Sequence, residues 1–211
     1  MLEVAAVAFT TFFVTLGPIE AAAMFAALTQ NRPTKQRHSM ALRAILVATG
    51  ILLTFAVLGD WLLRLLGISL AALQTAGGIL LLLIAIDMVF ARDSGGITTT
   101  NAETQEATQK QDISVFPLAT PLIAGPGAIA AVILLIANAQ GDWGTQLIVI
   151  AALLAVLLIT LSALFGAAYI QKVLGVAGQH VVSRIFGVLL CALAVQFMFN
   201  GIGQSGLFPS S

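Results

Sequence analysis

The chain has 211 residues, of which 59% are hydrophobic and only 9% are charged, whereas an ordinary soluble domain carries about 25% charged residues. Most of its surface must therefore face a solvent other than water, and the composition predicts an all-α integral membrane protein surrounded by the lipid bilayer. Nine basic and nine acidic side chains cancel to a formal net charge of zero. The chain therefore lacks the net positive charge that would favour binding to a nucleic acid.

Six apolar runs are long enough to cross the bilayer, since a membrane helix needs roughly 20 mostly apolar residues. The first run follows Met1, Leu2 and Glu3 and lacks the positive n-region and the cleavage site of a secretory signal, so we expect it to be retained. The six predicted crossings lie near residues 4–28, 42–66, 69–91, 114–138, 145–171 and 185–203.

A glycine-proline pair, Gly17 and Pro18, lies near the middle of the first run. Proline has no N–H, and irregular backbone at this depth is tolerated only where it is buried in protein or lines a polar cavity. A half-helix that begins after such a break presents free N–H groups and the positive end of its dipole, which suits a substrate carboxylate. The alternative is a kink that only shapes helix packing.

Glu20 is the one acidic residue near a predicted midplane, where a charge costs at least about 2.5 kcal/mol. The sequence leaves two possible roles of the Glu20 side chain open. The carboxylate either caps the half-helix after the first break, or it faces a central cavity and binds a substrate ammonium group or a coupled proton.

The lysines and arginines predict the orientation, because short loops rich in these residues stay in the cytoplasm. Only Arg64 falls on the opposite side of the predicted topology, next to a loop with Asp60 and Trp61; the other opposite loop holds Asp142 and Trp143. We therefore expect both termini outside, the tryptophans at the outer interface and residues 92–112 as a cytoplasmic linker. The predicted cytoplasmic basic residues are Arg32, Lys35, Arg37, Arg43, Arg92, Lys110, Lys172 and Arg184.

The second half of the chain repeats features of the first. Gly17-Pro18 recurs as Gly125-Pro126 at an offset of 108 residues, and a glycine-led apolar run at Gly78 recurs at Gly187 at an offset of 109. The sequence predicts a three-helix repeat at 1–91, the linker at 92–112 and a second repeat at 113–211. Because three crossings are an odd number, the repeats must be inverted, as in many secondary transporters.

The fourth run contains the second predicted break, at Pro121 and Gly125-Pro126-Gly127. Two breaks at equivalent depths should face each other across a site at the midplane. The predicted substrate-binding residues are Gly17, Pro18, Glu20, Pro121, Gly125, Pro126 and Gly127.

Residues 117–127, Pro-Leu-Ala-Thr-Pro-Leu-Ile-Ala-Gly-Pro-Gly, closely resemble the fourth-helix signature of the MarC family of prokaryotic inner-membrane proteins. Residues 77–86 and 187–202 resemble its third and sixth helices. The resemblance implies a six-helix carrier of neutral amino acids within the wider group of small exporters that includes lysine exporters. Family members commonly carry Asp-Pro-x-Gly-Asn-x-Pro in the first helix, whereas this chain keeps only the first proline, Pro18, and places its acid at Glu20.

These features together predict a secondary transporter that moves small neutral amino acids, or related small zwitterionic metabolites, across the prokaryotic inner membrane by alternating access. An ion or small-molecule channel or exporter is the alternative, because broken helices also line pores. We expect no enzyme and no metal site, since hydrolase and zinc-protease motifs are lacking and His38 and His180 are placed in cytoplasmic loops. Beyond a coupling proton or sodium ion no cofactor is expected, Cys191 has no internal disulfide partner, and a homo-oligomer is left open.

Overall fold

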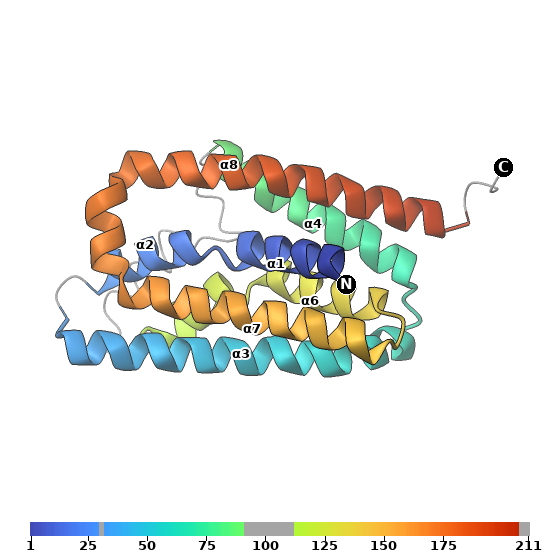
Figure 1. Cartoon of the computed structure of the whole chain (residues 1–211), viewed down its shortest axis with the longest axis horizontal. Helices are drawn as coiled ribbons and strands as arrows, with labels where there is room; N and C mark the ends of the chain where they lie inside the picture. The colour runs from blue at the N-terminus through green and yellow to red at the C-terminus, as the bar shows by residue number, and fades with distance from the viewer. Residues whose placement is uncertain (30–31, 91–111, 207–211) are drawn as a thin grey trace.

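The computed structural model describes residues 1–29, 32–90 and 112–206, and these residues form helices without any strand (Figure 1). Apart from Asp112, the predicted linker lies outside the described residues. Among the described residues, five helices are long and apolar enough to cross a membrane, and a bent helix pair gives a sixth if the pair forms one span. The predicted all-α fold with six crossings is thus confirmed at this level.

The spans are built from eight helical segments. The first span consists of α1 (Leu2–Leu16) and α2 (Pro18–Leu28), and the fourth consists of η1 (Ser114–Ile123), a π-helical segment, and α6 (Pro126–Asn138). The remaining spans are α3 (Thr34–Leu65), α4 (Leu70–Phe90), α7 (Trp143–Phe165) and α8 (Ala167–Gln204).

Local chemistry explains where several of these helices begin and end. Asp142 is the N-cap of α7, and its carboxylate accepts a hydrogen bond of 2.9 Å from the backbone N–H of Thr145. After α3, Gly67 adopts the left-handed angle φ 68° that favours glycine and turns the chain toward α4. Trp61 and Trp143 remain exposed near these turns, as interfacial anchors do.

Three boundaries differ from the sequence prediction. α3 begins at Thr34, so His38 lies on a helix and not in a loop. His180 likewise lies within α8, which makes the loop placement of both histidines wrong. The fifth span ends at Phe165 because Gly166 ends α7, and α8 then changes direction at Gly175 (φ 58°, ψ −176°) before it crosses the membrane. Hydropathy marks the part of a helix that lies in lipid, whereas polar helical turns continue beyond it.

The broken first span lies in the middle of the bundle (Figure 1). α1 and α2 pack against α7 and α8, while α3 packs against η1, α6 and α7. The start of α3 and the join between α7 and α8 lie at one end of the bundle, and the start of α1 and the end of α8 lie toward the other (Figure 1). An even number of crossings requires this common placement of the termini.

α4 and α8 form the most extensive helix pair of the bundle. Their backbones approach closely at two glycines: a Cβ at Gly78 would lie 2.7 Å from the Ala194 carbonyl oxygen, and a Cβ at Gly187 would lie 3.1 Å from the Ala85 carbonyl oxygen. The same offset of 109 residues relates the two glycines and the two alanines. The contact is therefore reciprocal, as a two-fold relation between the halves requires; the inverted repeat itself stays a prediction.

Candidate functional site

The first break is confined to a single residue. α1 ends at Leu16, Gly17 adopts a left-handed conformation (φ 53°, ψ 62°), and Pro18 is the first residue of α2. The Gly17 N–H still donates to the Phe13 carbonyl at 3.2 Å. Pro18 has no N–H for the Val14 carbonyl, which therefore lacks its usual helical donor. A left-handed residue followed by proline thus interrupts the helix at its predicted position.

Glu20 lies in the first turn of α2, and its carboxyl group folds back over the break. A Cβ at Gly17 would lie 3.0 Å from Glu20 Oε2. The other oxygen, Oε1, is shielded from solvent and has no hydrogen-bond partner. The carboxyl group also lies beside its own backbone N–H and beside Ser183 of α8. Glu20 therefore meets the second half of the chain across a helix interface.

The second break bends the fourth span by 55°. The Ala124 N–H donates to the Ala119 carbonyl at 2.8 Å, Gly125 is extended (φ −80°, ψ 173°), and α6 begins at Pro126. A Cβ at Gly125 would collide with the Pro121 carbonyl oxygen. Glycine is required here because the backbone approaches itself, and not because of a positive φ.

η1 is irregular throughout, because two prolines interrupt it. Phe116 and Thr120 precede Pro117 and Pro121, and both have extended backbone angles, as residues before proline prefer. The two peptide bonds before these prolines are cis. The first half of the fourth span is thus irregular along its length, whereas α6 is a regular helix.

The two broken spans lie against each other in the bundle. α1 contacts α6, and η1 contacts both α1 and α2. Segments of the two broken spans are therefore neighbours, whereas a substrate site between the two breaks stays a prediction.

The predicted site residues differ in their environments. Pro18 and Gly127 are buried, Pro126 is exposed, and the others are half-buried: Gly17, Glu20, Pro121 and Gly125. A Cβ at Gly127 would lie 2.6 Å from Ile84 Cδ1 of α4. Gly127 thus allows close packing between α6 and α4, whereas the residues next to it form the break.

Polar side chains that the sequence analysis missed lie near both broken spans. Ser183 of α8 lies beside Glu20. On α4, Gln74 is 1% exposed and donates from Nε2 to Asn138 Oδ1 of α6 at 2.5 Å, while its Oε1 is buried without a partner. Gln74 and Ser183 are separated by 109 residues, the offset of the glycine-led runs. The repeat alignment was the signal that could have identified both.

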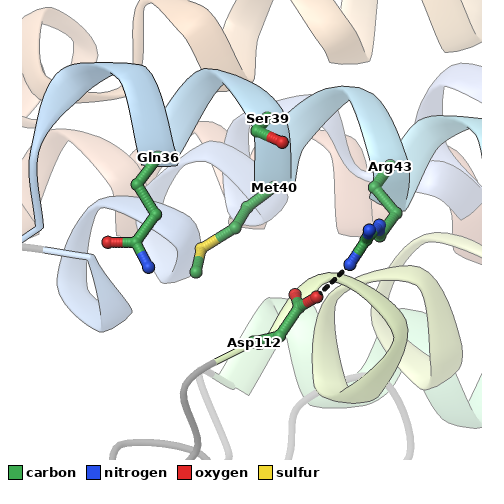
Figure 2. A pocket seen from close by; sticks show the side chains of 5 residues that line it. All are labelled: Gln36, Ser39, Met40, Arg43 and Asp112. Carbon is green, nitrogen blue, oxygen red and sulfur yellow. Dashed lines mark hydrogen bonds and ion pairs between the residues drawn. The ribbon is translucent and has the colours of Figure 1, made fainter.

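A separate, open hollow of about 230 Å³ lies at the end of the bundle where α3 begins. Figure 2 shows the side chains that line it, with the Arg43 guanidinium directed at the Asp112 carboxylate. The lining residues are Gln36, Ser39, Met40, Arg43 and Asp112. The hollow is thus a feature of the predicted cytoplasmic end, and it contains none of the residues predicted for the substrate site.

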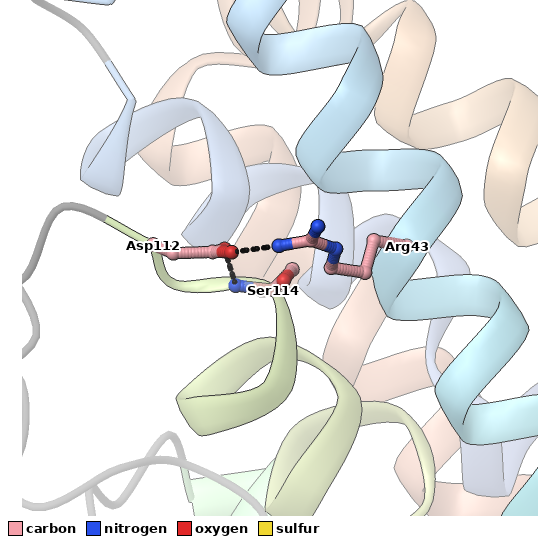
Figure 3. Close-up of polar contacts among 3 residues, drawn as sticks. All are labelled: Arg43, Asp112 and Ser114. Atoms are coloured by element: carbon pink, nitrogen blue, oxygen red, sulfur yellow. Dashed lines mark hydrogen bonds and ion pairs between the residues drawn. The ribbon is translucent and has the colours of Figure 1, made fainter.

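Asp112 joins two parts of the fold at this hollow (Figure 3). Its Oδ2 accepts a hydrogen bond from Arg43 of α3, and its Oδ1 accepts one of 2.9 Å from the Ser114 N–H at the start of η1. Hydrogen bonds from Ser114, together with the Arg43 guanidinium, hold the pKa of the Asp112 carboxyl below its usual range. One carboxylate therefore ties the start of the fourth span to the second span.

Within the described ranges, no three histidine, cysteine, aspartate or glutamate side chains come together as a metal site. Cys191 is a free, half-buried thiol. The chemistry available among the described residues at the breaks is that of free backbone groups, the Glu20 carboxyl group, and the hydroxyl groups of Thr15, Thr120 and Ser183.

Comparison with known proteins assigns the chain to a family. The model of the MarC family of integral membrane proteins matches residues 2–205. A UPF0056 membrane protein of Methanocaldococcus jannaschii is 41% identical over 195 residues, which cover 92% of this chain and 94% of the relative. No solved structure matches the chain.

Two bacterial relatives give the same result. The UPF0056 membrane protein YvbG of Bacillus subtilis is 34% identical over 201 residues, which cover 95% of this chain and 94% of the relative. The UPF0056 membrane protein YhcE of Escherichia coli is 35% identical over 208 residues, which cover 95% and 92%. Since the similarity extends over nearly the whole length of archaeal and bacterial membrane proteins, this chain belongs to the MarC family of integral membrane proteins.

Proposed function

We propose that this protein is a secondary transporter that moves small neutral amino acids, or related small zwitterionic metabolites, across the prokaryotic inner membrane by alternating access. The observation that carries the proposal is the pair of broken spans packed against each other. α2 and α6 each begin at a proline directly after a glycine, in the middle of a span. Discontinuous helices of this kind form the midplane sites of many secondary transporters.

The chemistry at the breaks suits a small zwitterion. The first turns of α2 and α6 carry free N–H groups and the positive ends of helix dipoles, which attract a carboxylate. The Glu20 carboxyl group offers an acceptor for an ammonium group at the same break. Within the described residues next to the breaks, this pairing of an anion-binding helix end with one acid favours a substrate that carries both charges.

The arrangement of the halves supports alternating access. The reciprocal glycine contacts between α4 and α8 are those expected of two copies related by a two-fold axis. The contact between Glu20 and Ser183 likewise joins residues of the two predicted repeats. A substrate held between the copies would be exposed to one side and then the other as the copies rock.

A ligand screen followed by uptake tests the substrate class. Purified protein is melted in the presence of each neutral amino acid, because a ligand that binds only the folded form adds about 2.7 kcal/mol of stability at 100 times its Kd. The amino acid that raises the melting temperature should then enter proteoliposomes with saturable kinetics, whereas a charged amino acid of similar size should not. If no neutral amino acid stabilises the protein or is taken up, the proposed substrate class is wrong.

A further inference from the structure

The contact between Glu20 and Ser183 points to a ligand besides the substrate. We propose that these two side chains, together with the last carbonyls of α1, bind a small monovalent cation that is coupled to transport, a proton or a sodium ion. This inference rests on the proposed transport function: the coupled cation would occupy one oxygen of the Glu20 carboxyl group and leave the other as the acceptor for the substrate ammonium group.

The first argument is the uncompensated carboxyl group. Glu20 Oε1 is shielded from solvent and has no hydrogen-bond partner, and none of the described basic side chains forms an ion pair with Glu20. A carboxylate oxygen that is shielded from solvent without a donor is costly inside a membrane protein. A bound proton or a bound metal cation removes that cost.

The elements packed around α2 supply little other compensation. α2 contacts α1, α7, α8 and η1. α7 and η1 contain no charged residue, and α1 contains only Glu3, in its first turn. The titratable residues of α8 are Tyr169, Lys172, His180, Arg184 and the thiol of Cys191; of these, Tyr169, Lys172 and Arg184 are exposed. The guanidinium of Arg37 on α3 lies over the ring of Phe25 on α2, 5.7 Å from its centroid. The described side chains thus place no cation directly on the Glu20 carboxyl group, whose own N–H and the positive end of α2 supply part of the compensation.

The second argument is the set of oxygen atoms at the break. Pro18 cannot donate to the Val14 carbonyl, and the carbonyls that end α1 point toward the break over which the Glu20 carboxyl group is folded. The Ser183 hydroxyl comes from the facing helix. Carboxylate, hydroxyl and carbonyl oxygens are hard ligands, and carbonyls at the ends of half-helices coordinate sodium ions and protons in transporters with broken helices.

The third argument is the position of this group between the two halves. Glu20 belongs to the first predicted repeat and Ser183 to the second. A cation bound by both is held only while α2 and α8 are in contact. Movement of one half against the other would therefore change the affinity for the cation and for the substrate together, which is the condition for coupling.

Binding of the cation is tested without transport, by thermal melting of the purified protein in sodium chloride or choline chloride over a range of pH. If the ion is sodium, the wild-type melting temperature should be higher in sodium chloride than in choline chloride. If it is a proton, the melting temperature should rise as the pH falls, at pH values where other carboxyl groups do not titrate. Glu20→Gln should abolish this dependence, and Ser183→Ala should weaken the apparent affinity by about tenfold. Glu3→Gln, an exposed acid on α1, is the matched control and should behave as wild type.

The two ions are distinguished by driving uptake into proteoliposomes with a sodium gradient or with a pH gradient. One gradient should accelerate wild-type uptake, and Glu20→Gln should lose that acceleration. If the wild-type melting temperature and uptake respond to neither ion, or if Glu20→Gln and Ser183→Ala respond as wild type does, the cation site is wrong and Glu20 only caps α2. Failure of the transport proposal is recognised separately, by absence of substrate uptake under every gradient.

Discussion

At the scale of single residues, the two breaks use glycine for different reasons. Gly17 is needed for its left-handed angle, which costs other residues roughly 1–2 kcal/mol. Gly125 has an ordinary φ but no room for a Cβ beside the Pro121 carbonyl oxygen. Both spans contain a Gly-Pro pair, yet the first break is a single residue in the left-handed conformation and the second is a bend of 55° between two helices.

Gly125→Ala should reduce transport by tenfold or more while the protein still inserts in the membrane. The added Cβ must displace the Pro121 carbonyl group, and this changes the bend on which the proposed site depends; Gly125→Leu should abolish transport. Overpacking of this kind costs about 1–3 kcal/mol of stability. Uptake into proteoliposomes, normalised to the amount of inserted protein, is the measurement.

Gly50→Ala is the matched control, because a Cβ at Gly50 has no atom within 4 Å. This variant should transport at the wild-type rate and be slightly more stable, since alanine favours a helix over glycine by about 1 kcal/mol. If Gly125→Ala is expressed and transports normally, the second break is only a kink that shapes helix packing.

The sequence could predict the breaks but not all of their neighbours. Proline chemistry acts within one span, so Pro18 and Pro126 mark the starts of half-helices without any knowledge of packing. The position of Ser183 beside Glu20 depends on how α8 is rotated toward α2. Long-range contacts of this kind require the assembled bundle, and apolar helices carry little periodicity that could fix their rotation.

At the scale of the helices, α4 and α8 are held together by backbone contact at small residues. Without a hydrophobic driving force in lipid, helices associate through close van der Waals packing, which glycine permits. Gly78 and Gly187 provide this contact at two levels of the pair. The pair therefore links the two predicted halves by shape and not by charge.

Gly78→Ala and Gly187→Ala should each destabilise the protein by about 1–3 kcal/mol. The new Cβ atoms would approach carbonyl oxygens of the facing helix to 2.7 Å and 3.1 Å, so the helices must separate. A Cβ at Gly203 on α8 has no atom within 4 Å, so Gly203→Ala should be at least as stable as the wild type, since alanine favours a helix over glycine. Thermal melting in detergent measures the effect, and a Gly78→Ala protein as stable as Gly203→Ala would show that the close contact is absent.

The ion pair between Arg43 of α3 and Asp112, which precedes η1, should contribute only weakly to the stability of the protein. The Arg43 and Asp112 side chains are 63% and 42% exposed, and exposed ion pairs contribute about 0–1 kcal/mol. Asp112→Asn should therefore lower stability by less than about 1 kcal/mol at neutral pH, and the difference should shrink at high salt.

The pH dependence of this ion pair follows from the lowered pKa of Asp112. Because the folded pKa lies below the unfolded value of about 3.9, the stabilisation is present above that value. It is lost as the pH falls through the folded pKa. The melting temperatures of the wild type and Asp112→Asn should therefore converge on acidification; a difference that grows in acid would contradict the ion pair.

The element boundaries show what hydropathy can and cannot predict. The broken fourth span was predicted at residues 114–138, the bounds of η1 and α6 together, because both ends coincide with a change from apolar to polar residues. α3 begins earlier than predicted, since its first turns are polar yet helical. The direction change at Gly175 lies between the predicted crossings 145–171 and 185–203, so hydropathy marked this place as outside the lipid but could not show that the chain there is helical.

At the scale of the whole molecule, the chain ends and the turns divide between two ends of the bundle (Figure 1). The basic start of α3 lies at one end, and the start of α1 and the end of α8 lie toward the other, so the distribution of lysine and arginine predicts which end is cytoplasmic. The number of spans could be predicted from the lengths of the apolar runs along the chain. Their packing could not, because it depends on contacts between helices far apart in the chain.

Cysteine labelling tests this orientation in a Cys191→Ser background. A cysteine at Ser205, directly after α8, should react with an impermeant thiol reagent applied to intact cells. A cysteine at Thr99, in the predicted cytoplasmic linker, should react only after the membrane is opened. Labelling of Thr99→Cys in intact cells would show that the orientation is the reverse of the predicted one.

The central claim is that this MarC family protein is a carrier that binds substrate between two broken helices. Counter-flow in proteoliposomes tests it most directly: vesicles loaded with an unlabelled neutral amino acid are diluted into a trace of the same labelled compound. A carrier exchanges one for the other, so the label should accumulate transiently above its external concentration, and Gly125→Ala should suppress this accumulation while Gly50→Ala preserves it. Equilibration without accumulation would identify a channel and contradict the claim.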